Sequence, residues 1–492
     1  MGLIRSFDSM TILLIIAVLF VSLYFLKLLF RRNGAASPGG GKLLRPPGST
    51  GWPIIGEGLD FLKMSRTGVL EKFFFDRTQK YSSEIFSTAL LGENITFLGA
   101  GGAGNKFLFS NEFKLVNSWW PPAIRKIIPN AQQASTEQES KTLRKLYSQF
   151  FKPDALHRYI CIMDLMTRRH FENSWDNKEE VTVYPLVKNY TFSVACSLFL
   201  SIDDQGRVDE LHKPFSAMLD GFIALPINLP GTRLNRAIKA SNVIRKEIIS
   251  VIKQRKNNLS EKEAIPTQDT LSQIILFSDE DTGKFMTEMY IADLILGLLI
   301  AGHDTTTSVI TMVLKYIAEH PDVYSEVLKE QIEIAKSKAT GDLLNWADMH
   351  KMRYSWNVAC EVMRLAPPTP GGFKQATTDF TYAGYSFPKG WKFHWSIIST
   401  HKNPENFPDP ETFDPSRFDG NGPAPYTFVP FGGGPRVCPA QEFARLQILT
   451  FMHHLVRRYK WERLHPSDEK LIFKPLALPA KGLPIRLHHH EY

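Results

Sequence analysis

Cysteine is scarce in this sequence, with four in 492 residues, and no two of them form a close pair. A disulfide framework is therefore excluded, and the low count indicates a reducing compartment. Zinc-finger spacing, RNA-binding signatures, repeats of fixed period and interior Pro/Gly/Ser-rich linkers are also missing. Their absence argues against nucleic acid as a partner and against an array of small domains.

The charge balance is positive, with a net charge of +8 and a pI near 9.1. With nucleic acid set aside, this balance favours an anionic membrane surface or an acidic protein partner. The residues are 43% hydrophobic, which is enough for a large buried core. We therefore expect one large domain.

A long apolar run lies near the N-terminus, over residues 10–30, and ends at Arg31 and Arg32. Roughly twenty apolar residues span a bilayer as a helix, and positive charge after them favours a cytosolic main domain. A cleaved signal peptide is the alternative, although the run is long and no clear small-residue cleavage site follows it. We predict a lumenal N-terminus over 1–9, a transmembrane anchor over 10–30, a linker and proline-rich hinge over 31–52, and the main domain over 53–492.

The main domain reads as predominantly helical, with small β-sheets. Apolar residues recur at helical spacing over 136–151, 153–175, 239–256, 287–318 and 441–459. Alternating runs over 380–387 and 391–398 predict strands, with a turn at Pro388-Lys389-Gly390 between them. From residue 403 to 435 the chain is dense in Pro, Gly, Asp and Asn, so we expect mostly loop there.

The most informative stretch is residues 431–439, which read FGGGPRVCP. The glycines let the backbone approach a flat ligand, and the start of a helix just after Cys438 stabilises a thiolate. Arg436 is placed to pair with an anionic group. A buried small residue in a glycine loop is the alternative reading for a lone cysteine.

The whole pattern over 431–439 resembles the haem-binding loop of cytochromes P-450. The resemblance implies haem b (iron protoporphyrin IX), with Cys438 as axial ligand of the iron and Phe431 and Arg436 among the haem-binding residues. Arg144 stands where the family has a helix Arg that pairs a haem propionate. Two positions depart from the family pattern, because Ser140 replaces a usual Trp and Ala440 a usual Gly.

Further motifs of this family follow in the expected order. Residues 301–306 read AGHDTT within the long helix predicted over 287–318. The resemblance implies that Asp304 relays protons and that Thr305 hydrogen-bonds dioxygen; the alternative is a buried helix whose hydroxyls bond to carbonyls one turn earlier. Glu361 and Arg364 form the family's Glu-x-x-Arg pair, and Arg417 completes a network that supports the cysteine loop.

The resemblance implies insertion of one oxygen atom from dioxygen into a C–H bond. The cofactor performs this chemistry, while electrons come from NADPH through a separate NADPH–cytochrome P-450 reductase. We expect a monomeric, single-pass protein of the endoplasmic reticulum membrane, with its catalytic domain facing the cytosol. The intact Asp304 and Thr305 favour a true monooxygenase over relatives that isomerise peroxides.

Several segments are similar to plant triterpenoid oxidases of the β-amyrin 28-oxidase type. They include GWPIIGE over 51–57, GNKFLFSNE over 104–112, NLPGT over 228–232 and APYTFVPF over 424–431. The resemblance implies a hydrophobic isoprenoid substrate, with up to three oxidations of one methyl carbon. An anchored enzyme with an apolar pocket suits such a substrate. Candidate pocket residues are Trp119, Trp120, Leu298, Ala301, Pro370, Gly371, Phe373 and Leu476.

Two alternatives remain open at this point. The first is a hydroxylase of another isoprenoid, such as a taxane-type diterpene, a sterol or a brassinosteroid. The second is a non-catalytic haem-binding membrane protein, which Asp304, Thr305 and the Glu361/Arg364/Arg417 set disfavour. The run Pro370-Gly371-Gly372 predicts either a wider pocket or a different carbon presented to the haem.

Overall fold

The computed structural model describes residues 13–24, 44–52, 56–81, 84–90, 93–99, 101–129, 136–265, 269–277, 286–468 and 470–490. The predicted lumenal N-terminus over 1–9 lies outside the described residues. So do both ends of the predicted anchor and most of the predicted linker.

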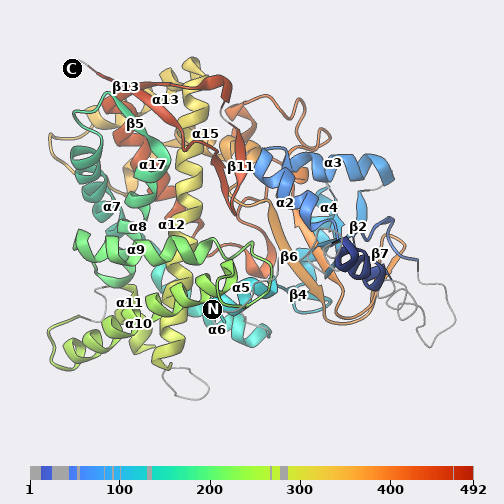
Figure 1. Ribbon diagram of the computed structural model, residues 1–492. Helices are drawn as coiled ribbons and strands as arrows, with labels where there is room; N and C mark the ends of the chain where they lie inside the picture. Colours follow the sequence, from blue (N-terminus) through green and yellow to red (C-terminus); the bar gives the residue numbers. More distant parts are fainter. Residues whose placement is uncertain are drawn as a thin grey trace, which may run out of the picture.

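Two regions lie side by side in Figure 1, one made mostly of helices and one that holds the larger sheet with α2 and α3. The long helix α12, Glu288–Glu319, runs through the helical region and begins at Thr287, whose hydroxyl accepts from the N–H of Tyr290. The other helices are α2 Gly58–Thr67, α3 Leu70–Tyr81, α4 Gly102–Ser110, α5 Pro122–Ile127, α6 Glu137–Phe150, α7 Pro153–Ser174, α8 Val183–Leu200, α9 Gln205–Leu219, α10 Arg233–Ser260, α11 Thr270–Leu276, α13 Pro321–Lys336, α14 Trp346–Lys351, α15 Arg353–Leu365, α16 Ile397–His401 and α17 Gln441–Arg458.

The strands form one larger sheet and three small ones. The larger sheet has the order β1-β2-β3-β9-β6-β4, with β9 parallel to β3 and antiparallel to β6. Its strands are β1 Gly48–Ser49, β2 Ile85–Leu90, β3 Glu93–Leu98, β9 Lys392–Ser396, β6 Gly371–Ala376 and β4 Val116–Ser118. The small sheets contain β10 Tyr459–Arg463, β13 Pro484–His489 and β5 Glu180–Thr182; β11 Leu471–Phe473 and β12 Ala477–Pro479; and β7 Phe380–Tyr382 and β8 Tyr385–Phe387.

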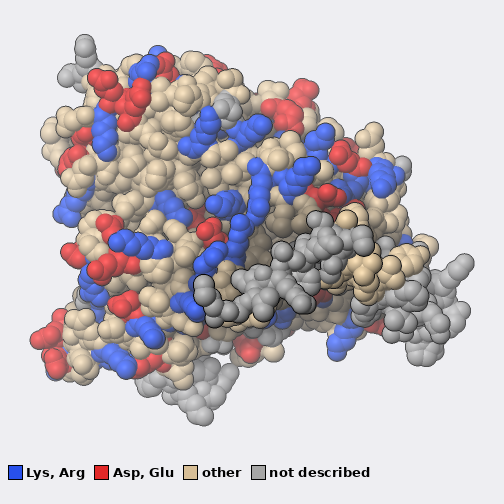
Figure 2. All heavy atoms as spheres, in the orientation of Figure 1, with Lys and Arg blue, Asp and Glu red and all other residues tan. Residues whose placement is uncertain are grey.

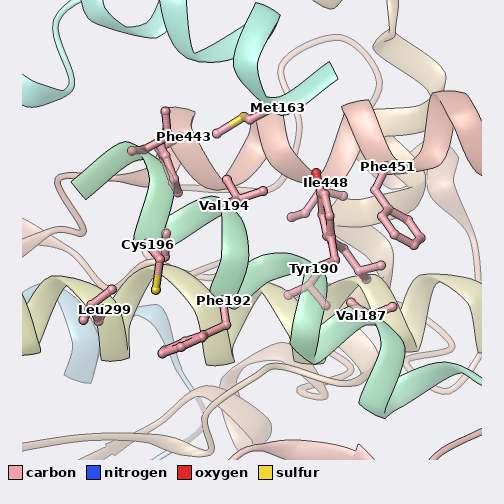
Figure 3. Close-up of a cluster of buried hydrophobic side chains, with 14 of the residues drawn as sticks. Met163, Val187, Tyr190, Phe192, Val194, Cys196, Leu299, Phe443, Ile448 and Phe451 are labelled. Atoms are coloured by element: carbon pink, nitrogen blue, oxygen red, sulfur yellow. The ribbon is translucent and has the colours of Figure 1, made fainter. Parts of the chain in front are cut away.

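Helix α8 lies at the centre of the main hydrophobic core, between α7, α12 and α17. In Figure 3 its side chains point in several directions, with Phe192 toward α12 and Val194 toward α17. Tyr190 and Phe451 meet across the α8–α17 boundary with ring centroids 5.2 Å apart. Because α8 is buried nearly all round, it lacks the one-sided apolar pattern that identifies a surface helix, and it was therefore not among the predicted helices.

The predicted elements agree with the structure apart from their ends and one subdivision. Helix α10 begins six residues before the predicted start at 239 and ends four residues after 256. The run over 380–387 is a hairpin of two short strands, because Ala383 and Gly384 adopt positive φ angles of 50° and 79° and turn the chain. Within 403–435, only the short 3-10 turns at Pro415–Phe418 and the start of Gly434–Arg436 interrupt the predicted loop.

The described part of the predicted anchor is a short apolar helix over Leu13–Tyr24, consistent with a membrane anchor. Its large apolar side chains are mostly exposed. Helix α12 is also long and apolar enough to cross a membrane, but 72% of its apolar window is buried inside the protein, so it is a core helix. Figure 2 shows charges of both signs mixed on one face of the molecule, with a row of Lys and Arg side chains across its middle.

A buried ion pair fastens α10 to α12. Arg245 Nε lies 2.5 Å from Asp293 Oδ1, with side-chain exposures of 7% and 1%, and the guanidinium also donates to the carbonyl of Ile127 at 2.6 Å. We expect Asp293→Ala to lower the free energy of unfolding by about 3–5 kcal/mol, because it leaves a buried cation unpaired. Glu326→Ala removes the exposed Lys329–Glu326 pair and should cost no more than about 1 kcal/mol. Urea unfolding followed by circular dichroism measures both, and equal costs would contradict this account.

Candidate active site

The cysteine loop ends in a hydrogen-bonded turn directly before α17. The N–H of Cys438 donates to the carbonyl of Phe431 at 2.9 Å, and Gly432 and Gly434 adopt positive φ angles of 72° and 65°. Burial raises the pKa of the Cys438 thiol, while the N–H of Ala440 and the guanidinium of Arg144 oppose this shift. The loop therefore presents a single thiol whose anion has a backbone donor and a cation beside it.

The glycines of the loop are required by the protein's own packing. A Cβ on Gly433 would lie 2.4 Å from the ring of Phe109, and one on Gly434 would lie 2.5 Å from the carbonyl oxygen of Phe109. Helix α4, which carries Phe109, thus sits directly against the loop. We had explained these glycines by the approach of a flat ligand, but two of the three have a neighbour within the chain that already excludes a side chain.

The two arginines of the predicted site lie at the cysteine loop. Arg144, on α6, donates to the carbonyl of Val437 and is close enough to Cys438 and Arg436 for their charges to affect its pKa, which burial lowers. Arg436 donates to Glu112 at 2.6 Å, and Glu112 also accepts from Lys374 at 2.5 Å. Glu112 and Lys374 were not among the predicted site residues, because nothing near them in the sequence marks a charged cluster.

The predicted motif on α12 packs against the helix that follows the cysteine. A Cβ on Gly302 would lie 3.2 Å from the ring of Phe199 on α8 and 3.8 Å from that of Phe443 on α17. Phe443 stands five positions after Cys438, so this contact brings the cysteine loop and the α12 motif together. Because α8 fills the space beside Gly302, the glycine permits close helix packing.

Asp304 and Thr305 point to different surroundings. The Thr305 hydroxyl donates to the carbonyl of Ala301 at 2.7 Å, which is the helical back-bond that we considered as the alternative. Its oxygen keeps the capacity to accept a further hydrogen bond. Asp304 is 6% exposed and lies 3.6 Å from Lys188 Nζ and 3.3 Å from His303 Nε2.

The predicted Glu361, Arg364 and Arg417 come together in the interior. Arg364 donates to both carboxylate oxygens of Glu361 at 2.7 Å, and Arg417 Nε lies 3.5 Å from Glu361. Arg364 also donates to the carbonyls of residues 401, 410 and 412, while the N–H of residue 414 donates to Glu361 at 2.9 Å. The pair thereby fixes the long loop that leads to Cys438.

The predicted pocket residues come from segments that meet near α12. Ser308, one turn after Thr305, donates to the carbonyl of Ala477 at 2.5 Å, which places the β11–β12 hairpin and Leu476 against α12. The N–H of Ala477 donates to the carbonyl of Pro368 at 3.0 Å, so the segment with Pro370 lies beside it. Leu298 is buried on α12, Ala301 is exposed and Trp120 is partly buried.

Some of the predicted pocket residues also have a packing role within the chain. Phe373 meets Trp119 edge to face with ring centroids 5.6 Å apart, so these two candidates form one aromatic pair. A Cβ on Gly372 would lie 2.7 Å from the indole of Trp395, and one on Gly371 would lie 2.0 Å from its carbonyl oxygen. The glycine run is therefore required by the neighbouring strand β9, whatever its effect on the pocket.

Comparison with known proteins agrees with this arrangement. The sequence model of the family described as Cytochrome P450 matches residues 46–487. A relative from Vitis vinifera named beta-amyrin 28-monooxygenase is 58% identical over 97% of this chain and 98% of its own length, and one of the same name from Medicago truncatula is 56% identical with the same coverage. A solved structure, retinoic acid bound cyanobacterial CYP120A1, superposes with a TM-score of 0.82 at 32% identity over 91% of this chain and all of that one.

The chain belongs to the cytochrome P450 family. It is a haem-thiolate monooxygenase, an oxidoreductase of the class that takes electrons from NADPH through a reductase and acts on hydrophobic substrates. The residues present fit haem. Cys438 supplies the thiol, Arg144, Arg436 and Lys374 supply cations near the loop, and Ala301 is an exposed position on a helix that is otherwise largely buried.

We expect Glu361→Gln to abolish most haem incorporation, because it breaks a fully buried ion pair and leaves Arg364 uncompensated, at a cost of about 3–5 kcal/mol. The carbon monoxide difference spectrum of the reduced protein measures this. Glu462→Gln, which alters the exposed Arg486 pair, is the control and should keep the spectrum. Normal haem content in Glu361→Gln would contradict a structural role for the pair.

Gly433→Ala should lower haem retention and the thermal unfolding temperature, since its Cβ would collide with Phe109. The double variant Gly433→Ala/Phe109→Ala should recover part of the haem retention. Gly104→Ala lies on the same helix as Phe109 and meets only ordinary contacts of 3.5 Å or more, so it should behave as the unaltered protein. The collision is not the cause if the double variant is no better than Gly433→Ala alone.

Proposed function

We propose that this monooxygenase oxidises the C-28 methyl group of a β-amyrin-type triterpenoid, in successive steps to the alcohol, the aldehyde and the acid. The observation that carries the proposal is the similarity to several relatives named beta-amyrin 28-monooxygenase, 55–58% identical over nearly their whole length. The intact acid and alcohol on α12 are consistent with oxygen insertion.

The chain's own groups have separate tasks in this proposal. Haem, with Cys438 as its thiolate ligand, supplies the activation of dioxygen. Arg144 and Arg436 would hold its propionates, and Phe431, whose carbonyl accepts from the N–H of Cys438, would shape the cysteine loop. Asp304 would supply protons, and the Thr305 hydroxyl would supply a hydrogen bond at the reacting group.

The pocket is proposed to lie between α12, the segment before β6 and the β11–β12 hairpin. Leu298 and Ala301 would form one wall, Pro370 and Gly371 a second, and Leu476 a third. Trp119, Trp120 and Phe373 would add aromatic surface at the larger sheet. Such a pocket presents mainly apolar contacts to a rigid hydrocarbon and orients it by shape.

The setting follows from the same assignment. We propose a single-pass anchor over 10–30 in the endoplasmic reticulum membrane, a hinge over 31–52, and a monomeric catalytic domain over 53–492 that faces the cytosol. Its electron donor is proposed to be a membrane-bound NADPH–cytochrome P-450 reductase. A triterpene dissolves in the bilayer, so an anchored enzyme meets its substrate at high local concentration.

The test is expression with a plant reductase in yeast that makes β-amyrin, followed by mass spectrometry of the extracts. We expect products oxygenated at C-28, absent in the Cys438→Ala control, because that variant has lost the proposed haem ligand. Oxygenation at another carbon would overturn the regiochemistry. No product from protein that still shows a thiolate-haem carbon monoxide spectrum would overturn β-amyrin as substrate, and other triterpenes, diterpenes and sterols would be tried next.

A further inference from the structure

A cavity lies between α9 and α10, which are side by side in the helical region (Figure 1). Its volume is about 190 Å³. Leu211 and Pro214 of α9 line it, as do Ile244 and Ile248 of α10 and Leu200 at the end of α8. None of the predicted haem-binding or substrate-pocket residues lines it. The cavity is therefore separate from the proposed substrate pocket, and it is either a gap in the packing or a site for a different molecule.

The volume of the cavity limits the size of an occupant. An apolar cavity of about 150 Å³ inside a protein binds one benzene molecule. The cavity between α9 and α10 is slightly larger, so a single ring with small alkyl substituents fits it. A triterpenoid has several fused rings and is too large. An occupant of this cavity is therefore not the proposed substrate.

A hydrogen-bond acceptor lies beside the cavity because α9 contains a proline. Pro214 is inside the helix and has no N–H, so the carbonyl of Glu210, one turn earlier, loses the donor that position 214 would otherwise supply. Glu210 and Pro214 both line the cavity. A hydroxyl group on an occupant can take the place of the missing donor, and an unpaired carbonyl away from water is otherwise costly.

The charges around the cavity favour a neutral occupant. Its apolar walls are buried, and burial of a charge against such walls is unfavourable whatever its sign. The charged residues that line it are Arg207, Glu210 and Glu247, all of them exposed, so one cation and two carboxylates surround the opening. An anion would meet an excess of negative charge there. Apolar walls with a few polar groups at the edge are typical of sites for small molecules.

Both walls of the cavity are connected to α12. On α9, Pro214 is followed by Phe215, whose ring lies 5.1 Å from that of His303 on α12. On α10, Ile244 is followed by Arg245, which pairs with Asp293 on α12 at 2.5 Å. A molecule that fixes the separation of α9 and α10 therefore acts on two contacts of the helix that carries the proposed acid and alcohol of the active site.

We propose that this cavity binds a neutral single-ring molecule with one hydroxyl group, and that the bound molecule is an effector that changes substrate affinity through α12. The ring lies against the apolar walls, and the hydroxyl group donates to the carbonyl of Glu210. The proposal rests on the monooxygenase class alone and is independent of β-amyrin as substrate.

The first test measures binding of two probes that share one carbon skeleton. Thymol is a single ring with one hydroxyl group, and p-cymene is the same molecule without it. Titration calorimetry of the holoenzyme, with an azole bound at the haem, should show about fivefold tighter binding of thymol, because only thymol supplies the donor. Pro214→Ala restores the N–H at position 214 and should make the two affinities equal. A preference for thymol that persists in Pro214→Ala would overturn the assigned acceptor.

The second test locates the bound probe. Val243 lines the cavity and is 52% exposed, so the larger side chain of Val243→Trp can fill the opening without entering the core. We expect this variant to lose thymol binding. Gln254→Trp places the same side chain at an exposed position of α10 outside the cavity and should bind thymol normally. The carbon monoxide spectrum and the thermal unfolding temperature check that both variants are folded. The site is wrong if the unaltered protein does not bind thymol or if Val243→Trp still binds it.

The third test measures the effect on substrate. The dissociation constant of any accepted isoprenoid, read from the haem absorbance shift, should change by at least about fivefold when thymol saturates the cavity. The change should be absent in Val243→Trp and present in Gln254→Trp. Direct competition by thymol at the haem would instead persist in Val243→Trp. An effect that persists there, or an unchanged constant in the unaltered protein, would overturn the effector role.

Discussion

The site depends on one close approach, where α12 meets α8 and α17 at Gly302. The absence of a side chain lets the ring of Phe199 lie close against the helix backbone, and the ring of Phe443 is the neighbour from α17 at the same position. Phe443 belongs to the first turn of α17, so the same contact sets the position of Cys438, while Phe199 sets α8 and with it Lys188. The thiol and the acid are thus positioned from one point in the core, on different sides of the same helix.

The second constraint is the buried Glu361–Arg364 pair. A buried ion pair gives little net stability, but its removal is expensive, because the remaining charge has no water around it. Here the guanidinium of Arg364 also donates to the carbonyls of residues 401, 410 and 412. The pair thereby fixes an irregular chain segment. The long Pro- and Gly-rich stretch before Cys438 has no regular ladder of its own and takes its shape from this pair.

Much of this arrangement could be predicted from the sequence, since each motif is local. The thiol, the acid and alcohol of α12, and the Glu361–Arg364 pair are each recognisable within a few residues, and the helices with one apolar face were located although the ends of α10 were not. Helix α8 was missed because it is apolar on all sides. Lys188 and Glu112 were not predicted, because the partner of each lies more than one hundred residues away along the chain.

The glycines of the cysteine loop and of the run at 371–372 lie against other parts of the chain. At the glycines that we had assigned to contact with a flat ligand, Phe109 fills the space that a side chain would take. At the glycines assigned to a wider pocket, Trp395 fills that space. A glycine in a sequence reports that something approaches the backbone, but it does not report what approaches.

The contact between Phe109 and the cysteine loop also bears on how the protein is made. It joins residues more than three hundred positions apart, as does the nearby bond between Arg436 and Glu112. Closing so large a loop costs chain entropy before any contact compensates it, and contacts of long sequence separation form slowly. Synthesis delivers α4 well before the loop. The cofactor-binding surface is therefore completed only after the segment that carries Cys438 has been synthesised.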